Sequence, residues 1–405
     1  MTDTPRRAEE AHNNAFQQRL TNSLKQRESV HQRRMRRCVD AINTTECFVD
    51  GQRCLSFATN DYLGLTRHPA VVAAYAEVAA IQAGAGASGL IAGRTPHHAR
   101  LEAAIADFEG TESALLFPSG FAANFGTLTS LIGKQDTVFS ERENHASLID
   151  GCRASTGKVF IYSRTELDQL QNSIAQSRND CDAVFIVTDT VFSMDGTLAD
   201  LTQICDIADR FNATLIVDEA HGTGVFGASG RGVCELQKVD HRVAVRIGTL
   251  SKAVGGLGGF VAGSRVLCEW LWNSARSQFF STALPPAVCA AATTALRIIT
   301  QEPERRRTLA ARAQFARQLL HEFGLEMIFA PLDSPIIAIL IGDDDRAMRV
   351  SSQMMANGFF IPAIRPPSVA SGTARLRMSL CSDHTEDQIR SAVYQLREVV
   401  RNAGG

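Results

Sequence analysis

The chain has 405 residues, of which 45% are hydrophobic and 21% are charged, and its formal net charge is −2. This composition is typical of a globular protein with a large core, and the charge balance argues against nucleic acid or an anionic membrane as the main partner. No apolar run approaches the roughly 20 residues that a membrane span needs, and the ten cysteines contain no C-x-x-C pair or other zinc spacing. We therefore expect a cytoplasmic protein with no metal, nucleic-acid or membrane partner.

The first 60 residues are predicted to form an N-terminal helical arm. The opening stretch is polar, rich in arginine and helical in character, and it lacks the apolar region of a secretory signal. Within it, the basic run "HQRRMRRC" covers residues 31–38. We interpret this run as a solvated helix, with nucleic-acid binding as the less favoured alternative.

The next part of the chain alternates helical patterns with short apolar runs. Six of these runs are predicted as strands, at residues 113–119, 136–140, 158–162, 182–192, 213–221 and 243–250. Such alternation predicts an α/β fold with a mostly parallel sheet covered on both faces, in a large domain over residues 61–300. Residues 301–405 combine long helical stretches with three further runs, at 334–342, 359–364 and 374–380, and predict a smaller α+β domain.

Polar motifs follow five of the six predicted strands, namely "PSGFAAN", "NHAS", "SMDG", "DEAHGTG" and "LSK". Because ligands of open α/β sheets bind at the carboxyl ends of the strands, these motifs mark a candidate site. They surround Lys252, one of only five lysines in a chain with 41 lysines and arginines together. Lysine, unlike arginine, can lose its proton in a desolvated pocket, so Lys252 is predicted to be a nucleophile of the Schiff-base type. The alternative is an ordinary loop lysine in solvent.

Two other motifs point to different functions but lack the context that those functions need. The letters "DEAH" at residues 218–221 match the acidic box of an ATP-dependent helicase, yet no phosphate-binding G-x-x-x-x-G-K-S/T loop precedes them. The letters "GTGVFG" at residues 222–227 match a dinucleotide-binding pattern, yet the glycines continue into more loop instead of opening a helix. A DEAH-type ATP-dependent protein and an NAD oxidoreductase therefore stay as remote alternatives.

The strand-end motifs resemble those of the α-oxoamine synthases, which are fold type I pyridoxal-phosphate enzymes. The resemblance runs from "NDYLGL" (60–65) to "ARLRMSLCSDHT" (374–385), with "VFSMDG", "VDEAHGTG", "GTLSKA" and "FSTALPP" in the expected order between them. It implies an acyltransferase that joins an amino acid to an acyl thioester with loss of carbon dioxide. It also implies pyridoxal 5′-phosphate as cofactor and a homodimeric assembly.

The resemblance further implies roles for individual residues around the cofactor. Lys252 would hold the cofactor as a Schiff base, and Asp218 would face the pyridine nitrogen and keep it protonated. His221 would reach the phenolic oxygen of the cofactor or the substrate carbonyl, and His145 would stack on the ring. The remaining implied contacts around the cofactor are Ser119, Gly120 and Phe121 at a helix N-terminus, Thr249, Ser193 on the substrate side, and Ser281 and Thr282 from the other subunit.

The resemblance implies three substrate-binding residues. Arg377 would pair with the carboxylate of the amino acid, whereas its neighbour Arg375 is expected in solvent. Asn60 would line the substrate entrance, and Arg34, in the basic N-terminal run, would contact the distal end of the acyl chain. Two positions depart from the family pattern, Leu90 and Asp189, and they are expected to alter the shape of the acyl channel.

One segment bears on which acyl group is used. "AIRPPSVASGTARLRMSL", residues 363–380, is similar to the branch of the family that condenses pimeloyl thioester with L-alanine in biotin synthesis. The expected product is 8-amino-7-oxononanoate, and the acyl carrier is left open between coenzyme A and an acyl carrier protein. Another α-oxoamine synthase, such as a glycine C-acetyltransferase, is the alternative.

Overall fold

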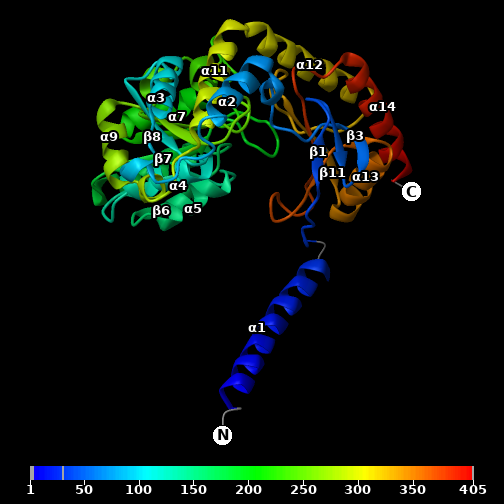
Figure 1. The fold of residues 1–405 in the computed structure, drawn as a ribbon, viewed down its shortest axis with the longest axis horizontal. Coiled ribbons are helices and arrows are strands. Elements are labelled where there is room, and N and C mark those ends of the chain that lie inside the picture. Colours follow the sequence, from blue (N-terminus) through cyan, green and yellow to red (C-terminus); the bar gives the residue numbers. More distant parts are fainter. Residues whose placement is uncertain (1–3, 30–31, 404–405) are drawn as a thin grey trace.

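The computed structural model describes residues 4–29 and 32–403. Figure 1 shows two lobes side by side, with helix α1 (Thr4–Ser29) extending away from both of them. Helix α12 (Pro303–Glu322) runs from the larger lobe to the smaller one. Within the described ranges, no helix combines the length and the apolar character that crossing a membrane requires.

A seven-stranded sheet forms the centre of the larger lobe. Its strands in chain order are β4 (Ser113–Phe117), β5 (Thr137–Glu141), β6 (Lys158–Tyr162), β7 (Val184–Asp189), β8 (Thr214–Asp218), β9 (Val245–Thr249) and β10 (Gly259–Gly263). They lie in the order β4-β10-β9-β8-β7-β5-β6. Strand β10 is antiparallel to β4 and β9, and the other neighbours are parallel. The expected mostly parallel sheet is therefore confirmed.

Helices cover both faces of this sheet because its strands are apolar on both faces. One face packs against α3 (Pro96–Glu109), α6 (Leu167–Ser177), α7 (Leu201–Phe211) and α11 (Pro286–Gln301). The other face packs against α4 (Gly120–Leu131), α5 (Ala146–Ala154) and α9 (Arg265–Ser274). Leu115 and Leu116 of β4 show the alternation, since each belongs to the core on a different face. The short helices α2 (Pro69–Ala79), α8 (Val233–Leu236) and α10 (Arg276–Phe279) complete this lobe.

The sequence does not predict strand β10, because its residues "GFVAG" have glycine at both ends and only three apolar residues between them. The second residue of the strand, Phe260, pairs with Gly248 of β9. A Cβ atom on Gly248 would lie 2.3 Å from the Phe260 ring, so the missing side chain leaves the space that the ring fills. This pairing fixes β9, the strand that leads to Lys252, between two neighbours.

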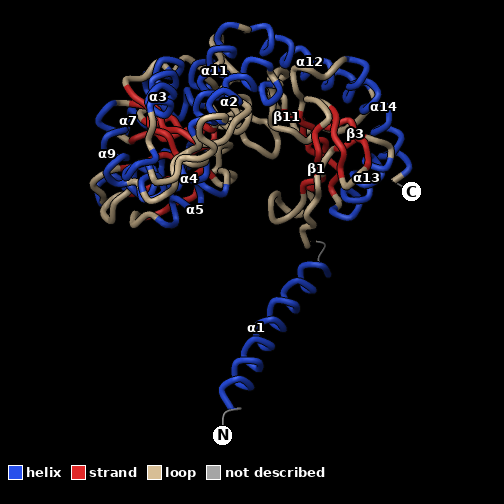
Figure 2. Tube along the Cα trace, in the orientation of Figure 1, coloured by secondary structure: helices blue, strands red, loops and turns tan. Residues whose placement is uncertain are grey.

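The smaller lobe contains two small sheets and the C-terminal helices. Figure 2 shows the strands of the molecule in two separate groups, one in each lobe. One small sheet has the order β1-β2-β3-β12 and the other the order β11-β14-β13. The strands are β1 (Val39–Ala41), β2 (Glu46–Val49), β3 (Gln52–Ser56), β11 (Ile336–Gly342), β12 (Phe359–Phe360), β13 (Ala363–Ile364) and β14 (Ala374–Ser379). Helices α13 (Asp344–Ala356) and α14 (Glu386–Asn402) pack beside them.

The prediction of a helical arm over residues 1–60 is wrong for its second half, because residues 39–56 form strands β1 to β3. Asp50 and Gly51, with φ of 49° and 88°, make the two-residue turn between β2 and β3, and an Asp-Gly pair is a strong hairpin signal. Residues 32–38 of the basic run are not helical either, and residue 31 lies outside the described residues. The domain boundaries near residues 60 and 300 stay predictions.

Candidate active site

Lys252 lies in a glycine-rich turn that joins β9 to β10. Thr249, the last residue of β9, donates a hydrogen bond from its hydroxyl to the carbonyl of Gly258 across this turn, at 2.9 Å. Gly258 has a φ of 123°, which residues with a side chain rarely adopt, so the turn requires glycine there. The closed turn holds Lys252, half-buried, just beyond the carboxyl end of β9.

The surroundings of Lys252 favour its neutral form. Burial lowers the pKa of the Lys252 amino group to about 8. The carboxylates of Asp218 and Asp189 oppose this shift, and the guanidinium of Arg377 adds to it. A lysine with a pKa near 8 is neutral in a far larger fraction of molecules at physiological pH than a lysine in water, and the neutral amine is the nucleophile.

Asp218 ends strand β8, next to β9, and is buried. Asn124 of α4 donates a hydrogen bond to Oδ2 of Asp218 at 2.6 Å, and the backbone N–H of Ala220 donates to Oδ1 at 2.7 Å. The Asn124 amide also donates to the Ser147 hydroxyl at 2.8 Å. Both oxygens of Asp218 are thus held by donors, which is the arrangement that suits a carboxylate. The sequence analysis did not single out Asn124.

His145 is the N-cap residue of α5, and hydrogen bonds hold both its ring and its backbone N–H. Its Nδ1 lies 2.7 Å from the Ser147 hydroxyl, and its backbone N–H donates to Oδ2 of Asp189 at 2.6 Å. Burial lowers the pKa of His145, and Lys252 acts in the same direction while Asp218 opposes it. Asp189, which the sequence analysis assigned to the acyl channel, therefore lies among the predicted cofactor residues instead.

His221 and Asn60 meet at Tyr62, which is fully buried. The Tyr62 hydroxyl lies 2.7 Å from Nδ1 of His221 and 3.3 Å from Oδ1 of Asn60. Burial lowers the pKa of His221 well below its usual range, and the charges of Lys252 and Arg377 add to that effect. His221 is therefore a neutral imidazole at physiological pH.

Arg377 of β14 reaches from the smaller lobe to the loop after β7. Its Nε donates to the carbonyl of Ser193 at 2.6 Å, and its Nη1 donates to the Ser379 hydroxyl at 2.7 Å. Nη2 donates to Oδ1 of Asn60 at 3.3 Å. Among the described side chains, no carboxylate forms an ion pair with this buried guanidinium. A buried cation in that situation is suited to an anionic ligand.

The expectation that Arg375 lies in solvent is wrong. Arg375 and Arg377 are both 7% exposed, because β14 is the central strand of its sheet and all six of its residues are buried. Arg375 donates from Nε to the carbonyl of Thr373 at 3.0 Å and from Nη2 to its hydroxyl at 3.1 Å. It therefore contacts the preceding turn, whereas Arg377 contacts the site.

The N-terminus of α4 lies against the end of β9. Ser119 caps the helix by accepting a hydrogen bond from the N–H of Ala122 at 3.1 Å. A Cβ atom on Gly120 would lie 3.2 Å from both Cβ and Oγ1 of Thr249, so glycine permits this close approach. The first N–H groups of a helix lack partners within it, and Phe121 follows in the same turn. The structure thus brings Ser119, Gly120 and Thr249 close together.

Other predicted site residues are not joined to this cluster. Ser281 and Thr282 lie after α10, and Thr282 forms an isolated β-bridge with Ser88. In the described part of the chain, neither hydroxyl hydrogen-bonds to a residue of the cluster. Arg34 lines a separate cavity of about 250 Å³ beside Pro366 and Pro367. Leu90 is 50% exposed.

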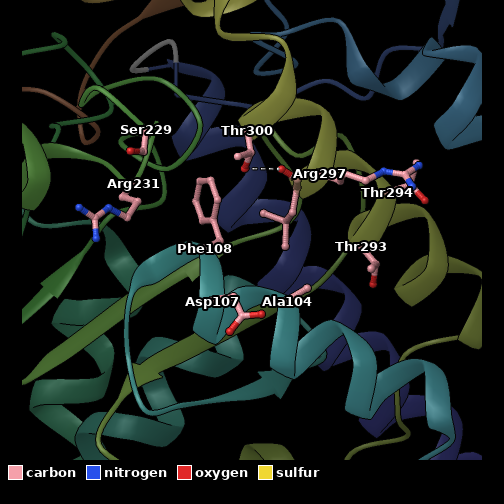
Figure 3. Close-up of a pocket in the computed structure, with 10 residues that line it drawn as sticks. Ala104, Asp107, Phe108, Ser229, Arg231, Thr293, Thr294, Arg297 and Thr300 are labelled. Atoms are coloured by element: carbon pink, nitrogen blue, oxygen red, sulfur yellow. Dashed lines mark hydrogen bonds between the residues drawn. The ribbon is translucent and has the colours of Figure 1, made fainter.

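A larger cavity of about 660 Å³ lies between α3, α11 and the loop at residues 229–231. Figure 3 shows Arg231 and Arg297 on opposite sides of Phe108, with their guanidinium groups directed away from each other. The Thr300 hydroxyl donates a hydrogen bond to the Leu296 carbonyl of its own helix, at 3.1 Å. Since its polar groups do not converge, this cavity is a weaker candidate than the strand-end cluster.

Comparison with known proteins shows which family the chain resembles over most of its length. Residues 52–396 match the family model of class I and II aminotransferases. The chain is 40% identical to the 8-amino-7-oxononanoate synthase of Lysinibacillus sphaericus over 363 residues, which cover 89% of this chain and 92% of that protein.

Two solved structures extend the comparison. A serine palmitoyltransferase from S. paucimobilis, solved with a bound PLP–myriocin aldimine, is 29% identical with a TM-score of 0.90, covering 95% of this chain and 97% of that one. An 8-amino-7-oxononanoate synthase from Francisella tularensis is 30% identical with a TM-score of 0.75, covering 86% of this chain and 98% of that one.

Proposed function

Because this chain belongs to the class I and II aminotransferase family, we propose that it works as an α-oxoamine synthase of biotin biosynthesis. It is an acyltransferase that joins L-alanine to a pimeloyl thioester and forms 8-amino-7-oxononanoate, carbon dioxide and the free thiol. The observation that carries this assignment is the 40% identity to an 8-amino-7-oxononanoate synthase over 89% of the chain.

The cofactor is pyridoxal 5′-phosphate, and the strand-end cluster fits it. When bound, this cofactor supplies an electron sink for negative charge on the α-carbon of the amino acid. Lys252 is the amine that would hold it, and Asp218 is the carboxylate that would pair with its ring nitrogen. Gly120 lets the N-terminus of α4 lie close to Thr249, and a helix N-terminus is the kind of site that would bind the phosphate. We propose His145 as the ring that packs on the cofactor.

The chain's own residues then bind and orient the substrates. Arg377 would bind the carboxylate of L-alanine, and its contacts with Ser193 and Asn60 hold the guanidinium in place for that task. His221, neutral and buried, would donate a hydrogen bond to an oxygen of the cofactor or of the acyl group. Lys252, with its lowered pKa, is a base that can accept a proton from the α-carbon.

Assembly and location remain proposals. We propose a cytoplasmic homodimer in which Ser281 and Thr282 contact the cofactor phosphate of the neighbouring subunit, since neither residue joins the cluster of its own chain. Phe121 and Ser193 are proposed to line the same site. Arg34 is proposed to contact the distal end of the acyl chain, since it shares a cavity with Pro366 and Pro367 of the segment that resembles the pimeloyl-using branch.

A substrate panel tests the reaction. Thiol release is measured with pimeloyl, acetyl, succinyl and palmitoyl thioesters, on coenzyme A and on an acyl carrier protein, each with L-alanine, glycine and L-serine. The proposal predicts the fastest release with pimeloyl donor and L-alanine, together with 8-amino-7-oxononanoate by mass spectrometry. Preference for acetyl donor with glycine, or for palmitoyl donor with L-serine, would contradict it.

A further inference from the structure

Tyr62 forms one short contact that the proposed roles do not use. Its hydroxyl oxygen lies 2.7 Å from Nδ1 of His221, with the two rings tilted by 54° at a centroid distance of 6.0 Å. Tyr62 is 0% exposed and His221 is 7% exposed. Water therefore has little access to this contact, and the two side chains must satisfy each other.

A single proton lies between these two atoms, because both groups are neutral. Burial raises the pKa of the Tyr62 hydroxyl, which keeps the phenol protonated. Burial also lowers the pKa of His221 well below its usual range, which leaves one proton on the imidazole. Either Tyr62 donates to Nδ1 and the imidazole proton sits on Nε2, or Nδ1 carries the proton and donates to the phenol oxygen.

Two observations favour donation by Tyr62. A separation of 2.7 Å is typical of a hydroxyl donor, whereas N–H donors usually lie about 2.9–3.0 Å from oxygen. In addition, the positive charge of Arg377 acts on the Tyr62 hydroxyl. A guanidinium attracts the oxygen end of an O–H group and turns the proton away from itself, and Nδ1 of His221 is the nearest acceptor, with Oδ1 of Asn60 farther at 3.3 Å.

We propose that Tyr62 is a positioning residue that fixes the tautomer of His221, donating to Nδ1 so that the imidazole proton stays on Nε2. Within the part of the chain that the structure describes, Nε2 of His221 has no hydrogen-bond partner, so it is free to donate to a ligand oxygen. Without the hydroxyl, the imidazole could move its proton to Nδ1 and would then present a lone pair to that oxygen. The role of His221 as a donor to a ligand rests on the proposed function of the site. The tautomer assignment rests on the Tyr62 contact alone.

The tautomer can be measured directly. In long-range ¹H–¹⁵N spectra of the ¹⁵N-histidine-labelled cofactor-loaded protein, a protonated ring nitrogen and an unprotonated one have widely separated shifts. A His221→Gln variant identifies the signals of His221. We expect a protonated Nε2 and an unprotonated Nδ1 in the unaltered protein, and a mixture of tautomers in Tyr62→Phe. A protonated Nδ1 in the unaltered protein would overturn the proposal, even if Tyr62→Phe were unstable.

Kinetics supply the second readout. Tyr62→Phe is expected to lower kcat roughly tenfold, the order of one lost buried hydrogen bond, while KM for L-alanine stays within about twofold because Arg377 is untouched. Tyr162→Phe is the matched control, since Tyr162 is also buried and its hydroxyl has no hydrogen-bond partner among the described residues. This control is expected to leave kcat and the His221 signals unchanged.

The outcomes separate the inference from the proposed function. If the unaltered protein releases no thiol with any donor but shows the expected His221 signals, the proposed function fails and the tautomer assignment stands. If the protein is active and Tyr62→Phe leaves the His221 signals as they were, the tautomer assignment fails and the proposed function stands.

Discussion

Asp189 and Asp218 are directly opposite each other at the carboxyl ends of the neighbouring strands β7 and β8. Two buried carboxylates so close together cannot both be ionised without a large cost in free energy. Burial raises the pKa of Asp189 well above its usual range, and the charge of Asp218 adds to that shift. Asp189 is therefore the member of the pair that is protonated more readily, while the hydrogen bonds to both oxygens of Asp218 suit the charged member.

This relationship predicts opposite results for two matched substitutions. Asp189→Asn keeps an acceptor for the His145 N–H and resembles the protonated carboxyl group that burial favours, so turnover is expected to stay within about threefold. Asp218→Asn removes the charge that would face the cofactor ring, and turnover is expected to fall on the order of 10²-fold or more. Equal losses in the two variants, in steady-state thiol release, would contradict the assignment of charge.

Asp189 should also be visible in the pH dependence of stability of the cofactor-free protein. Its folded pKa lies above its unfolded value, so between the two values the folded state binds a proton that the unfolded chain has released. Its contribution to stability is then fully present below the unfolded pKa, about 4, and is lost as pH rises through the folded pKa. Asp189→Asn is expected to remove that loss. In urea unfolding, the free energy of unfolding of the variant should therefore increase relative to that of the unaltered protein as pH rises.

The lowered pKa of Lys252, about 8, predicts the pH dependence of cofactor uptake. Uptake by the cofactor-free protein should accelerate as pH rises through about 8, because only the neutral amine reacts. Borohydride reduction and peptide mapping should then place the label on Lys252, and Lys252→Arg should give no label. A label on Lys25, Lys134, Lys158 or Lys238 would refute this role.

Arg377 and Arg375 form a second matched pair. Arg377→Lys cannot keep the three contacts to Ser193, Ser379 and Asn60, so KM for L-alanine is expected to rise about tenfold or more. Arg375→Lys loses only its bonds to Thr373, so the melting temperature is expected to fall while KM for L-alanine stays near its original value. If Arg375→Lys raised KM as much as Arg377→Lys, the carboxylate site would need to include both arginines.

Sharing of the site between subunits is tested by complementation. Lys252→Ala chains are mixed with chains that carry Ser281→Ala and Thr282→Ala, and mixed dimers are isolated by two different affinity tags. If the hydroxyls act across the interface, each mixed dimer holds one doubly damaged site and one intact site, so activity should return. Mixed dimers no more active than either parent would show that each site is built from one chain.

The central sheet could be predicted from sequence because its strands are buried on both faces. The runs at 182–192 and 213–221 contain uninterrupted apolar stretches, residues 183–187 and 215–217, and each run contains the strand that the structure has there, β7 and β8. Strands β1 to β3 are short and partly exposed, so they lack that signal, and only the Asp-Gly turn marks them. Strand β10 depends on the fit of Phe260 over Gly248, which no single-sequence pattern reveals.

The site was predicted from residues at strand ends, so residues that reach it from other parts of the fold were not predicted. Asn124 lies one helical turn inside α4, and Tyr62 lies in a segment far from Lys252 in the sequence, so only the fold brings them to Asp218 and His221. The expectation for Arg375 was wrong because the sequence does not show that β14 is the central strand of its sheet and buried at every residue.

The pairing of β3 with β12 sets an order of events during synthesis of the chain. Leu55 and Ser56 bond in parallel register to Phe359 and Phe360, and Gln52 bonds to the Met355 carbonyl, 303 positions away. The hairpin of β2 and β3 leaves the ribosome early, but the edge of β3 that pairs with β12 has no partner until the C-terminal part emerges. Contacts of such long separation form slowly. The unpaired hairpin edge is therefore where a nascent or C-terminally truncated chain is most exposed to chaperones and to association with other chains.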